Sequence, residues 1–469
     1  MRLRGRTMHL RSMTIAVHVA ALAAGIGASG AGCGGSVDER DQWTVWITTD
    51  APVPTFVDRA LVEVLNDDGN LACDDCRRLL GLPVDAASWP ISFGVAVPPS
   101  GIAPRVRVRL YRAARVAADG MPPIATTIDR VAKLPAARGN THVTFLLPMD
   151  CVGVVADVTS RTSCADASRE LVDERVLPTG MPPAEMAPGT WSRAVRRPCE
   201  LPVEEDMVCV PGGFFVLGDS VAGNVGAMES APERLVTVAP FALDREEMKV
   251  GTVRDLVRRG VLDEEPIMRS SERSSIASFC TWIGKSSKEN DDLPLNCVDH
   301  AFAAKVCTAL GKRLPTEAEW EWAAGNLEEE TLRPWGHDGD PCTYADVGLA
   351  DSLGVFPGSS LCRSLPGKET VPAGLPAQPN PRDRTALGLM AMGGGLGEWV
   401  ADRAAPYDAP CWRPEEPFLE DPRCDEGENF VIRGLSWGDA PGLLRVPGRQ
   451  SAPSSTWLPS IGFRCARSE

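Results

Sequence analysis

Histidine and tyrosine are scarce in this 469-residue chain, which has five and three of them respectively. Beyond the first 32 residues the histidines are His142, His300 and His337. They are far apart in the sequence, without the short spacings, such as HxxxH, that place two imidazoles on one metal ion. This scarcity argues against a histidine-based metal centre.

Basic residues are outnumbered, with 48 Lys and Arg against 63 Asp and Glu and a formal net charge of −15. Residues 1–32 hold four arginines and no acid, so the remainder has 44 basic and 63 acidic residues and a net charge of −19. An acidic surface repels nucleic acid phosphates, and no basic cluster with interleaved aromatic residues occurs. We therefore predict no nucleic acid partner.

Only the N-terminus carries a long apolar run. A basic stretch over residues 1–13 precedes an apolar, small-residue segment over 14–32, and Cys33 follows directly. This is the layout of a secretory signal, and the segment is too short and glycine-rich for a membrane span. Cys33 resembles the lipid-anchored cysteine of a lipobox, although Gly30 stands where leucine is usual. A lipoprotein-type signal and a plain signal peptide are the two alternatives, and both predict an extracytoplasmic protein of the bacterial cell envelope.

Besides Cys33, the chain has 14 cysteines, an even number. In an oxidising compartment such a set predicts a disulfide framework. Proximity in the sequence suggests three pairs: Cys151 with Cys164, Cys342 with Cys362, and Cys411 with Cys424. Cys73 and Cys76 have the spacing of a redox motif, but no strand–helix context supports a thioredoxin-like site. For these two we expect a loop staple or partners elsewhere.

Residues 40–165 are predicted to form an all-β, sandwich-like domain. Short β-branched runs, separated by Pro, Gly and Asp turns, lie at 43–49, 60–66, 91–97, 105–112 and 141–147. In the fourth run Val106, Val108 and Leu110 alternate with arginines, as in a strand with one buried face. Nothing catalytic is visible in this domain, so we expect a spacer or adhesion module.

The composition changes after residue 165. The proline-rich stretch 166–204 lacks a periodic apolar face and is predicted to be a linker. In the remaining domain, 205–469, strand-like runs precede apolar periodicity that predicts helices over 250–260 and 299–313. A third helix is expected to begin at Thr316, because Thr316 and Glu319 have the spacing of a capping box. Glycine-rich loops and short strands follow, so we expect an α+β domain with a large irregular share.

Several segments of the C-terminal domain resemble the formylglycine-generating enzyme family, also called the sulfatase-modifying factors. In chain order they include MVCVPGGFFVLGD, GKRLPTEAEWEWAAG, RPWGHDGDPCTYADV, GLGEWVAD, VIRGLSWGD and SIGFRCAR. The string GKRLPTEAEWEWAA is long and highly specific. The resemblance covers about 205–467. It implies a variant C-type-lectin-like fold and a disulfide between Cys307 and Cys465.

The segment IRGLSWGDAPGLLRVPGRQ, residues 432–450, departs from the catalytic members of the family. By the resemblance, those members carry two cysteines five residues apart that bind copper and oxidise a substrate cysteine to formylglycine. Here no cysteine lies between Cys424 and Cys465. The chain keeps the frame of that site and lacks its reactive pair, so copper is not expected.

Calcium is the other metal that the resemblance implies. The family's GNxWEW loop appears here as GGLGEW, which offers Glu398 and the carbonyls of Gly394 and Leu396. A second site, at YADV, offers Asp346 and the Val347 carbonyl. Calcium takes six to eight oxygens, and two side chains are few. The alternative is that Glu398 is a buried carboxylate that accepts backbone N–H bonds and needs no metal.

A non-catalytic binding or scaffolding module is therefore the function that we expect. The candidate groove residues are Ser436, Trp437, Asp439, Arg445 and Arg449, and the ligand is an unidentified protein, peptide or glycan. The alternative is a formylglycine-generating oxidase acting on sulfatase cysteines, which needs thiols such as Cys411 and Cys424 to reach the groove. Sulfoxide synthases of the ergothioneine type share this domain, but they need a histidine triad on an N-terminal helical bundle, and the N-terminal region here is β-rich.

Overall fold

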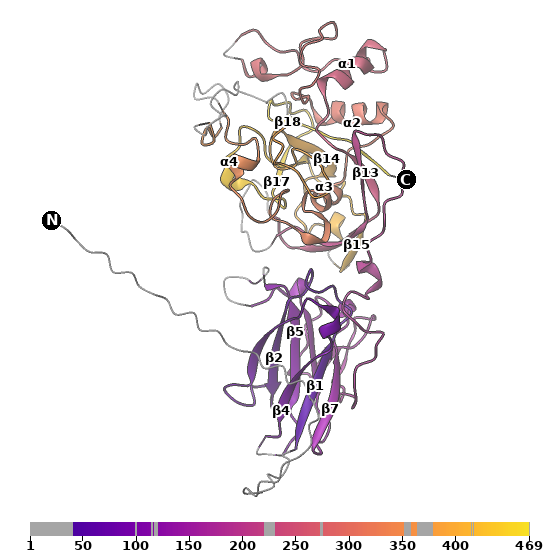
Figure 1. Cartoon of the computed structure of the whole chain (residues 1–469), viewed down its shortest axis with the longest axis vertical. Helices are drawn as coiled ribbons and strands as arrows, with labels where there is room; N and C mark the ends of the chain where they lie inside the picture. Colours follow the sequence, from indigo (N-terminus) through magenta and orange to yellow (C-terminus); the bar gives the residue numbers. More distant parts are fainter. Residues whose placement is uncertain are drawn as a thin grey trace, which may run out of the picture. The chain divides into compact units, whose positions relative to one another are not determined.

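The computed structural model describes residues 41–468, apart from 99–100, 114–115, 117–120, 220–229, 273–274, 351–357, 364–378, 414 and 416 (Figure 1). The predicted signal segment and Cys33 lie outside the described residues. Over the described part, no helix is long and apolar enough to cross a membrane.

The N-terminal domain is built from two sheets around one hydrophobic core. One sheet has the strand order β4-β1-β7 and the other β3-β2-β5-β6. Strands β1 and β7 pair in parallel, and the other pairs in these sheets are antiparallel. The strands are β1 (Gln42–Thr48), β2 (Arg59–Leu65), β3 (Arg77–Gly81), β4 (Ile91–Ala96), β5 (Arg105–Tyr111), β6 (Ile128–Lys133) and β7 (Asn140–Leu146). All five predicted strands are present, and β3 and β6 were not predicted.

Strand β5 has one face in the core and a polar face that is also covered. Val106, Val108 and Leu110 are fully buried, as the alternation predicts. On the opposite face Arg109 donates to Glu63 of β2 at 2.5 Å, and Arg107 donates to Asp129 of β6 at 2.8 Å and 2.5 Å. Carboxylates on the neighbouring strands thus neutralise the arginine charges, so this face can be covered by other residues.

The stretch 166–204 hydrogen-bonds along the N-terminal domain over part of its length. Strand β9 (Leu171–Asp173) pairs with β8 (Thr162–Cys164). Farther on, the Leu177 amide donates to the Lys133 carbonyl at 2.8 Å, and the Thr144 amide donates to the Pro178 carbonyl at 3.0 Å. These bonds tie the backbone of the proline-rich stretch to β6 and β7.

The C-terminal domain mixes short strands with few helices, as the sequence predicts. Three sheets have the orders β10-β13-β19, β11-β12-β15 and β17-β16-β14-β18. The strands are β10 (Met207–Val210), β11 (Gly213–Leu217), β12 (Arg234–Val238), β13 (Phe241–Asp244), β14 (Gly397–Arg403), β15 (Phe418–Glu420), β16 (Asn429–Arg433), β17 (Arg449–Pro453), β18 (Ile461–Gly462) and β19 (Ala466–Arg467). The helices are α1 (Val250–Arg258), α2 (His300–Ala309), α3 (Glu317–Ala324) and α4 (Pro341–Tyr344).

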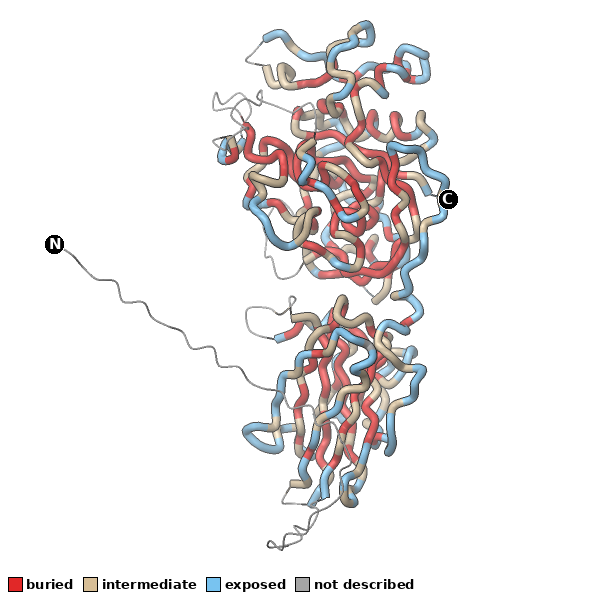
Figure 2. Tube along the Cα trace, viewed as in Figure 1, coloured by how far each residue is buried: buried red, intermediate tan, exposed pale blue. Residues whose placement is uncertain are grey.

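Local sequence signals position the two helices at the centre of this domain. Asp299 caps α2, since its carboxylate accepts a hydrogen bond from the Phe302 amide at 2.8 Å. Thr316 and Glu319 form the predicted capping box at the start of α3. Every residue of α3 is buried, including its three glutamates, and Figure 2 shows buried chain throughout the middle of the domain. A helix this deep needs partners for its charges.

Seven disulfides join all 14 cysteines of the described residues. The bonds Cys151–Cys164, Cys342–Cys362, Cys411–Cys424 and Cys307–Cys465 match the four predicted pairs, and Cys73–Cys76 forms the expected loop staple. Two further bonds, Cys199–Cys209 and Cys280–Cys297, were not predicted. This framework leaves no cysteine thiol in the described part of the chain.

Candidate functional site

The loop between β16 and β17 holds four of the predicted groove residues, and Arg449 begins β17. The first part of this loop forms a turn. The Asp439 carboxylate accepts hydrogen bonds from the Ser436 amide and hydroxyl, both at 2.7 Å. The Ser436 oxygen in turn accepts from the Gly438 amide at 3.3 Å. Ser436 is buried. These two residues therefore shape a turn, and the Ser436 hydroxyl proton is already committed.

Trp437 and Arg449 are buried like Ser436, which corrects the prediction that these residues form a contact surface. Trp437 is fully buried in an apolar cluster with Val347, Leu396 and Leu444, and its indole N–H donates to the Pro459 carbonyl at 3.1 Å. Arg449 is 1% exposed. Its guanidinium binds a buried carboxylate of α3, a partner 132 residues away in the sequence that local spacing could not reveal.

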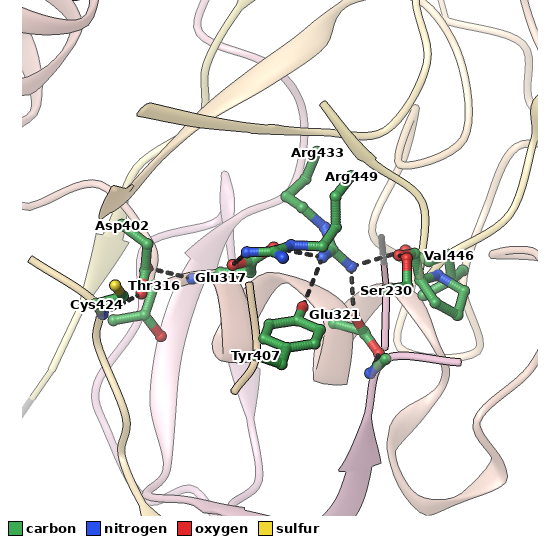
Figure 3. A network of polar contacts seen from close by, with 12 residues as sticks. Ser230, Thr316, Glu317, Glu321, Asp402, Tyr407, Cys424, Arg433, Val446 and Arg449 are labelled. Carbon is green, nitrogen blue, oxygen red and sulfur yellow. Dashed lines mark hydrogen bonds and ion pairs between the residues drawn. The ribbon is translucent and has the colours of Figure 1, made fainter. Parts of the chain in front are cut away.

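That carboxylate, Glu317, is at the centre of a buried ionic network (Figure 3). Arg449 binds it with two bonds, Nε at 2.6 Å and Nη2 at 2.8 Å. Arg433 of β16 donates to Glu317 at 2.7 Å and to Glu321 at 2.5 Å. The Arg449 guanidinium also lies 4.0 Å from the ring centroid of Tyr407. Two arginines thus neutralise two glutamates and tie α3 to β16 and β17.

The pKa values in the network follow from burial and from the arginines. Burial alone would raise the pKa of Glu317, but the charges of Arg449 and Arg433 outweigh it and hold the pKa below its usual value. Burial raises the pKa of Glu321, because Arg433 and the Gly218 amide offset it only in part. Burial raises the pKa of Tyr407 far above its ordinary value. The network therefore keeps Glu317 ionised, and its role is to stabilise the fold.

Asp402 of β14 extends the network and was not singled out in the sequence. Its carboxylate accepts the Glu317 amide at 2.7 Å and the Cys424 amide at 2.8 Å (Figure 3). Burial, together with the neighbouring Glu317 carboxylate, raises the pKa of Asp402 to about 7. Its side chain is therefore one that titrates inside the domain near neutral pH.

Arg445 is the predicted groove residue that does line a cavity, of about 200 Å³. Its side chain is partly exposed and forms an ion pair with Asp219. The cavity wall also includes Gly218, Glu321, Thr331, His337 and Val446. The Thr331 hydroxyl donates to the Arg333 carbonyl at 2.8 Å and so has no proton left for chemistry. The cavity combines charged side chains of both signs with apolar ones, which suits binding of a small polar side chain. Sequence reasoning missed the cavity because its walls are far apart in the chain.

Glu398, the predicted calcium ligand, is instead paired with an arginine. Arg464 donates to its oxygens from Nε at 2.9 Å and 2.8 Å and from Nη2 at 2.7 Å, and the Trp320 indole donates at 2.8 Å. The same guanidinium donates to the carbonyls of Met390 and Asp244 at 2.8 Å and 3.1 Å. The Arg464 guanidinium thus occupies the space among these carboxylate and carbonyl oxygens. Glu398 is therefore paired without a metal, and its donors are side chains rather than the backbone N–H groups of the metal-free alternative.

The other predicted calcium residues lie side by side. Gly394 contacts the Asp346 backbone so closely that an added Cβ would lie 2.9 Å from it, which explains glycine there. The Gly395 amide donates to the Asp346 carbonyl at 3.0 Å, and the Leu396 amide donates to Glu247 at 2.7 Å. Val347 and Leu396 have buried side chains in the cluster around Trp437. Over the described residues, no group of three or more His, Cys, Asp or Glu side chains is arranged to hold a metal ion.

Comparisons with known proteins point to one family for the C-terminal domain. The family model for the sulfatase-modifying factor enzyme 1-like domain matches residues 193–469. The chain is 28% identical over 296 residues to the inactive C-alpha-formylglycine-generating enzyme 2 of Bos taurus, covering 56% of this chain and 87% of that protein. It is 26% identical over 300 residues to the formylglycine-generating enzyme of Thermomonospora curvata, covering 56% and 94%. The solved structure of PvdO from Pseudomonas aeruginosa aligns with a TM-score of 0.43 and 22% identity, covering 59% of this chain and 100% of that one. The chain belongs to the sulfatase-modifying factor enzyme 1-like family.

Proposed function

We propose that the C-terminal domain is a non-catalytic binding or scaffolding module on a C-type-lectin-like frame. One observation carries the proposal: every described cysteine is in a disulfide, and the loop between Cys424 and Cys465 has no cysteine. A soft metal such as Cu(I) needs thiolate ligands, and so does exchange with a substrate thiol. The similarity to a protein named as an inactive member of the family supports the same conclusion.

The cavity beside Arg445 is the surface that we assign to ligand binding. Arg445 supplies a guanidinium beside Asp219, and Phe215 and Val446 supply apolar walls. Such a pocket suits one polar side chain of a protein or peptide partner, because a few placed polar groups in an apolar site fix orientation. The lectin-like frame holds the loops around it, so binding does not require the lost chemistry.

The competing function is a formylglycine-generating oxidase, and it needs two thiols. Cys411 and Cys424, the pair suggested for this role, form a disulfide with a Cα–Cα distance of 5.1 Å. Cys424 is fully buried and its amide donates to Asp402. An oxidase of this kind would have to reduce and expose a structural disulfide, which disfavours this alternative.

Cu(I) competition against a chromogenic chelator separates the two functions. The folded, oxidised chain is expected to leave the chelator fully metallated, and a peptide bearing a sulfatase cysteine is expected to keep its thiol. The same chain unfolded and reduced is the matched control, because its free thiols must then capture Cu(I). Stoichiometric Cu(I) uptake by the folded chain, or an aldehyde on the peptide, would overturn the proposal.

We also propose export and lipid anchoring through Cys33. Seven disulfides in one chain support an oxidising compartment, because reducing compartments keep thiols free. Labelling with an alkyne fatty acid should mark the chain in a bacterial host and not its Cys33→Ser variant. An unlabelled wild-type chain would instead indicate the plain signal peptide.

Calcium at Asp346, with the Val347 carbonyl, stays a prediction. The Asp346 carboxylate accepts the Asn380 amide at 3.0 Å and lies beside the Gly395 turn. A rise in the melting temperature on adding calcium chloride, abolished in Asp346→Asn, would support it. An unchanged melting temperature would count against it.

A further inference from the structure

The outer face of the sheet β4-β1-β7 carries an aromatic pair that the core does not use. Trp43, Val45 and Ile47 of β1 point into the hydrophobic core, so Trp46 points to the opposite face. Trp46 is half-buried there, beside the exposed His142 of β7.

One hydrogen bond fixes both rings. The indole N–H of Trp46 donates to Nδ1 of His142 at 2.9 Å. Both atoms lie at ring edges and the ring planes differ by 17°, with centroids 6.1 Å apart. The two ring planes are therefore nearly parallel, and the hydrogen bond joins the edge of the indole to the imidazole. Because Nδ1 accepts, the neutral imidazole carries its proton on Nε2 and can donate it outward.

The surroundings of the pair are polar and uncharged. Eleven residues on the three strands point to this face: Gln42, Thr44, Trp46, Thr48, Ser92, Gly94, Ala96, Asn140, His142, Thr144 and Leu146. None is Asp, Glu, Lys or Arg, although such residues make up 24% of the chain. At the register position opposite Thr44, Gly94 leaves open space, since an added Cβ would contact nothing within 4 Å.

The segment that contains Gly180 and Met186 covers one end of the face. The Thr48 hydroxyl donates to the Met186 carbonyl at 2.6 Å, and the Thr144 hydroxyl donates to the Gly180 carbonyl at 2.8 Å. At the other end Thr44 donates to the Asn140 side chain at 2.9 Å, and Gln42 and Asn140 are exposed. The result is a flat aromatic surface with a wall at one end and amide and hydroxyl groups at the other.

We propose that this face binds a neutral β-linked glycan, with a pyranose ring stacked on Trp46 and His142. The flat C–H face of a pyranose with equatorial substituents matches a flat aromatic surface, and its hydroxyls match the side chains of Gln42, Thr44 and Asn140. An acidic or basic peptide would find no opposite charge here. The site lies in the N-terminal domain and does not depend on the function proposed for the C-terminal domain.

Isothermal titration of the whole chain with cellohexaose and chitohexaose tests the proposal, with the curved, α-linked maltohexaose as contrast. We expect binding of at least one β-linked hexamer in preference to maltohexaose. Trp46→Ala should weaken it about tenfold or more, because it removes the stacking surface. Gly94→Leu should also weaken it, since it sets a branched side chain on the open surface without a steric clash at its Cβ.

The matched control is Leu79→Ala, which removes an exposed apolar side chain from β3 on the other sheet. It should leave binding unchanged. The proposal fails if the wild-type chain binds neither β-linked hexamer, or if Trp46→Ala binds as tightly as the wild type. It also fails if phosphatidylcholine vesicles sediment the wild type but not Trp46→Ala, because the face would then be a membrane surface.

Discussion

Asp402 is one of the carboxylates through which pH acts on the stability of this domain. Its pKa of about 7 in the folded protein lies above its ordinary value of 3.8, because burial and the Glu317 charge oppose ionisation. The folded state therefore holds a proton that the unfolded state releases. Its contribution to stability is complete below about pH 4 and is lost as the pH rises to about 7, with a slope of about 1.4 kcal/mol per pH unit.

Asp402→Asn should flatten this part of the pH dependence. The free energy of unfolding, measured by urea denaturation from pH 4.5 to 7.5, is expected to fall less steeply for the variant by about 1 kcal/mol per pH unit. The asparagine can accept only one of the two amides that Asp402 accepts, so the variant is also less stable overall. The difference in slope is thus the informative quantity, and parallel curves would show that Asp402 keeps an ordinary pKa.

At the scale of elements, α3 is held by charge as well as by apolar packing. Glu317 at its first turn is fully buried and meets both Arg433 and Arg449. Glu317→Gln leaves Arg449 without a carboxylate in the interior, and loss of one partner of a buried ion pair costs about 3–5 kcal/mol. Asp255→Asn, in the exposed pair with Arg259 on α1, is the control and should cost no more than about 1 kcal/mol. Equal losses in the two variants, measured by denaturant unfolding, would contradict an energetic role for the network.

The same helix shows what the sequence could and could not predict. The start of α3 was predictable because Thr316 and Glu319, three residues apart, satisfy each other locally. The role of Arg449 was not predictable, because its partner Glu317 is remote in the sequence. An arginine between glycine-rich segments is ordinarily expected at the protein surface. Strand β3 was missed for a related reason. Its residues are mostly exposed and show no alternation, and pairing with β2 defines it.

At the scale of the whole molecule, each domain has its own covalent ties. The N-terminal domain contains Cys73–Cys76 and Cys151–Cys164, which close short loops. In the C-terminal domain Cys307 of α2 bonds to Cys465 near the last strand, with a sequence separation of 158. This bond closes the longest loop of the seven disulfides, so it constrains the unfolded chain more than the others do.

Replacing both Cys307 and Cys465 with serine should therefore cost the most stability of any disulfide. The loop-entropy estimate is about 5 kcal/mol for a closed loop of this length, and two serine hydroxyls in a fully buried site add to the loss. The Cys73→Ser/Cys76→Ser variant is the matched control, because its loop spans three residues and lies near the surface. The same estimate gives about 2 kcal/mol for it. Thermal unfolding of both variants under oxidising conditions makes the comparison. The prediction is contradicted if Cys307→Ser/Cys465→Ser loses no more stability than the control variant. The long loop would then be ordered already in the unfolded chain, or strain in the native bond would offset its entropic gain.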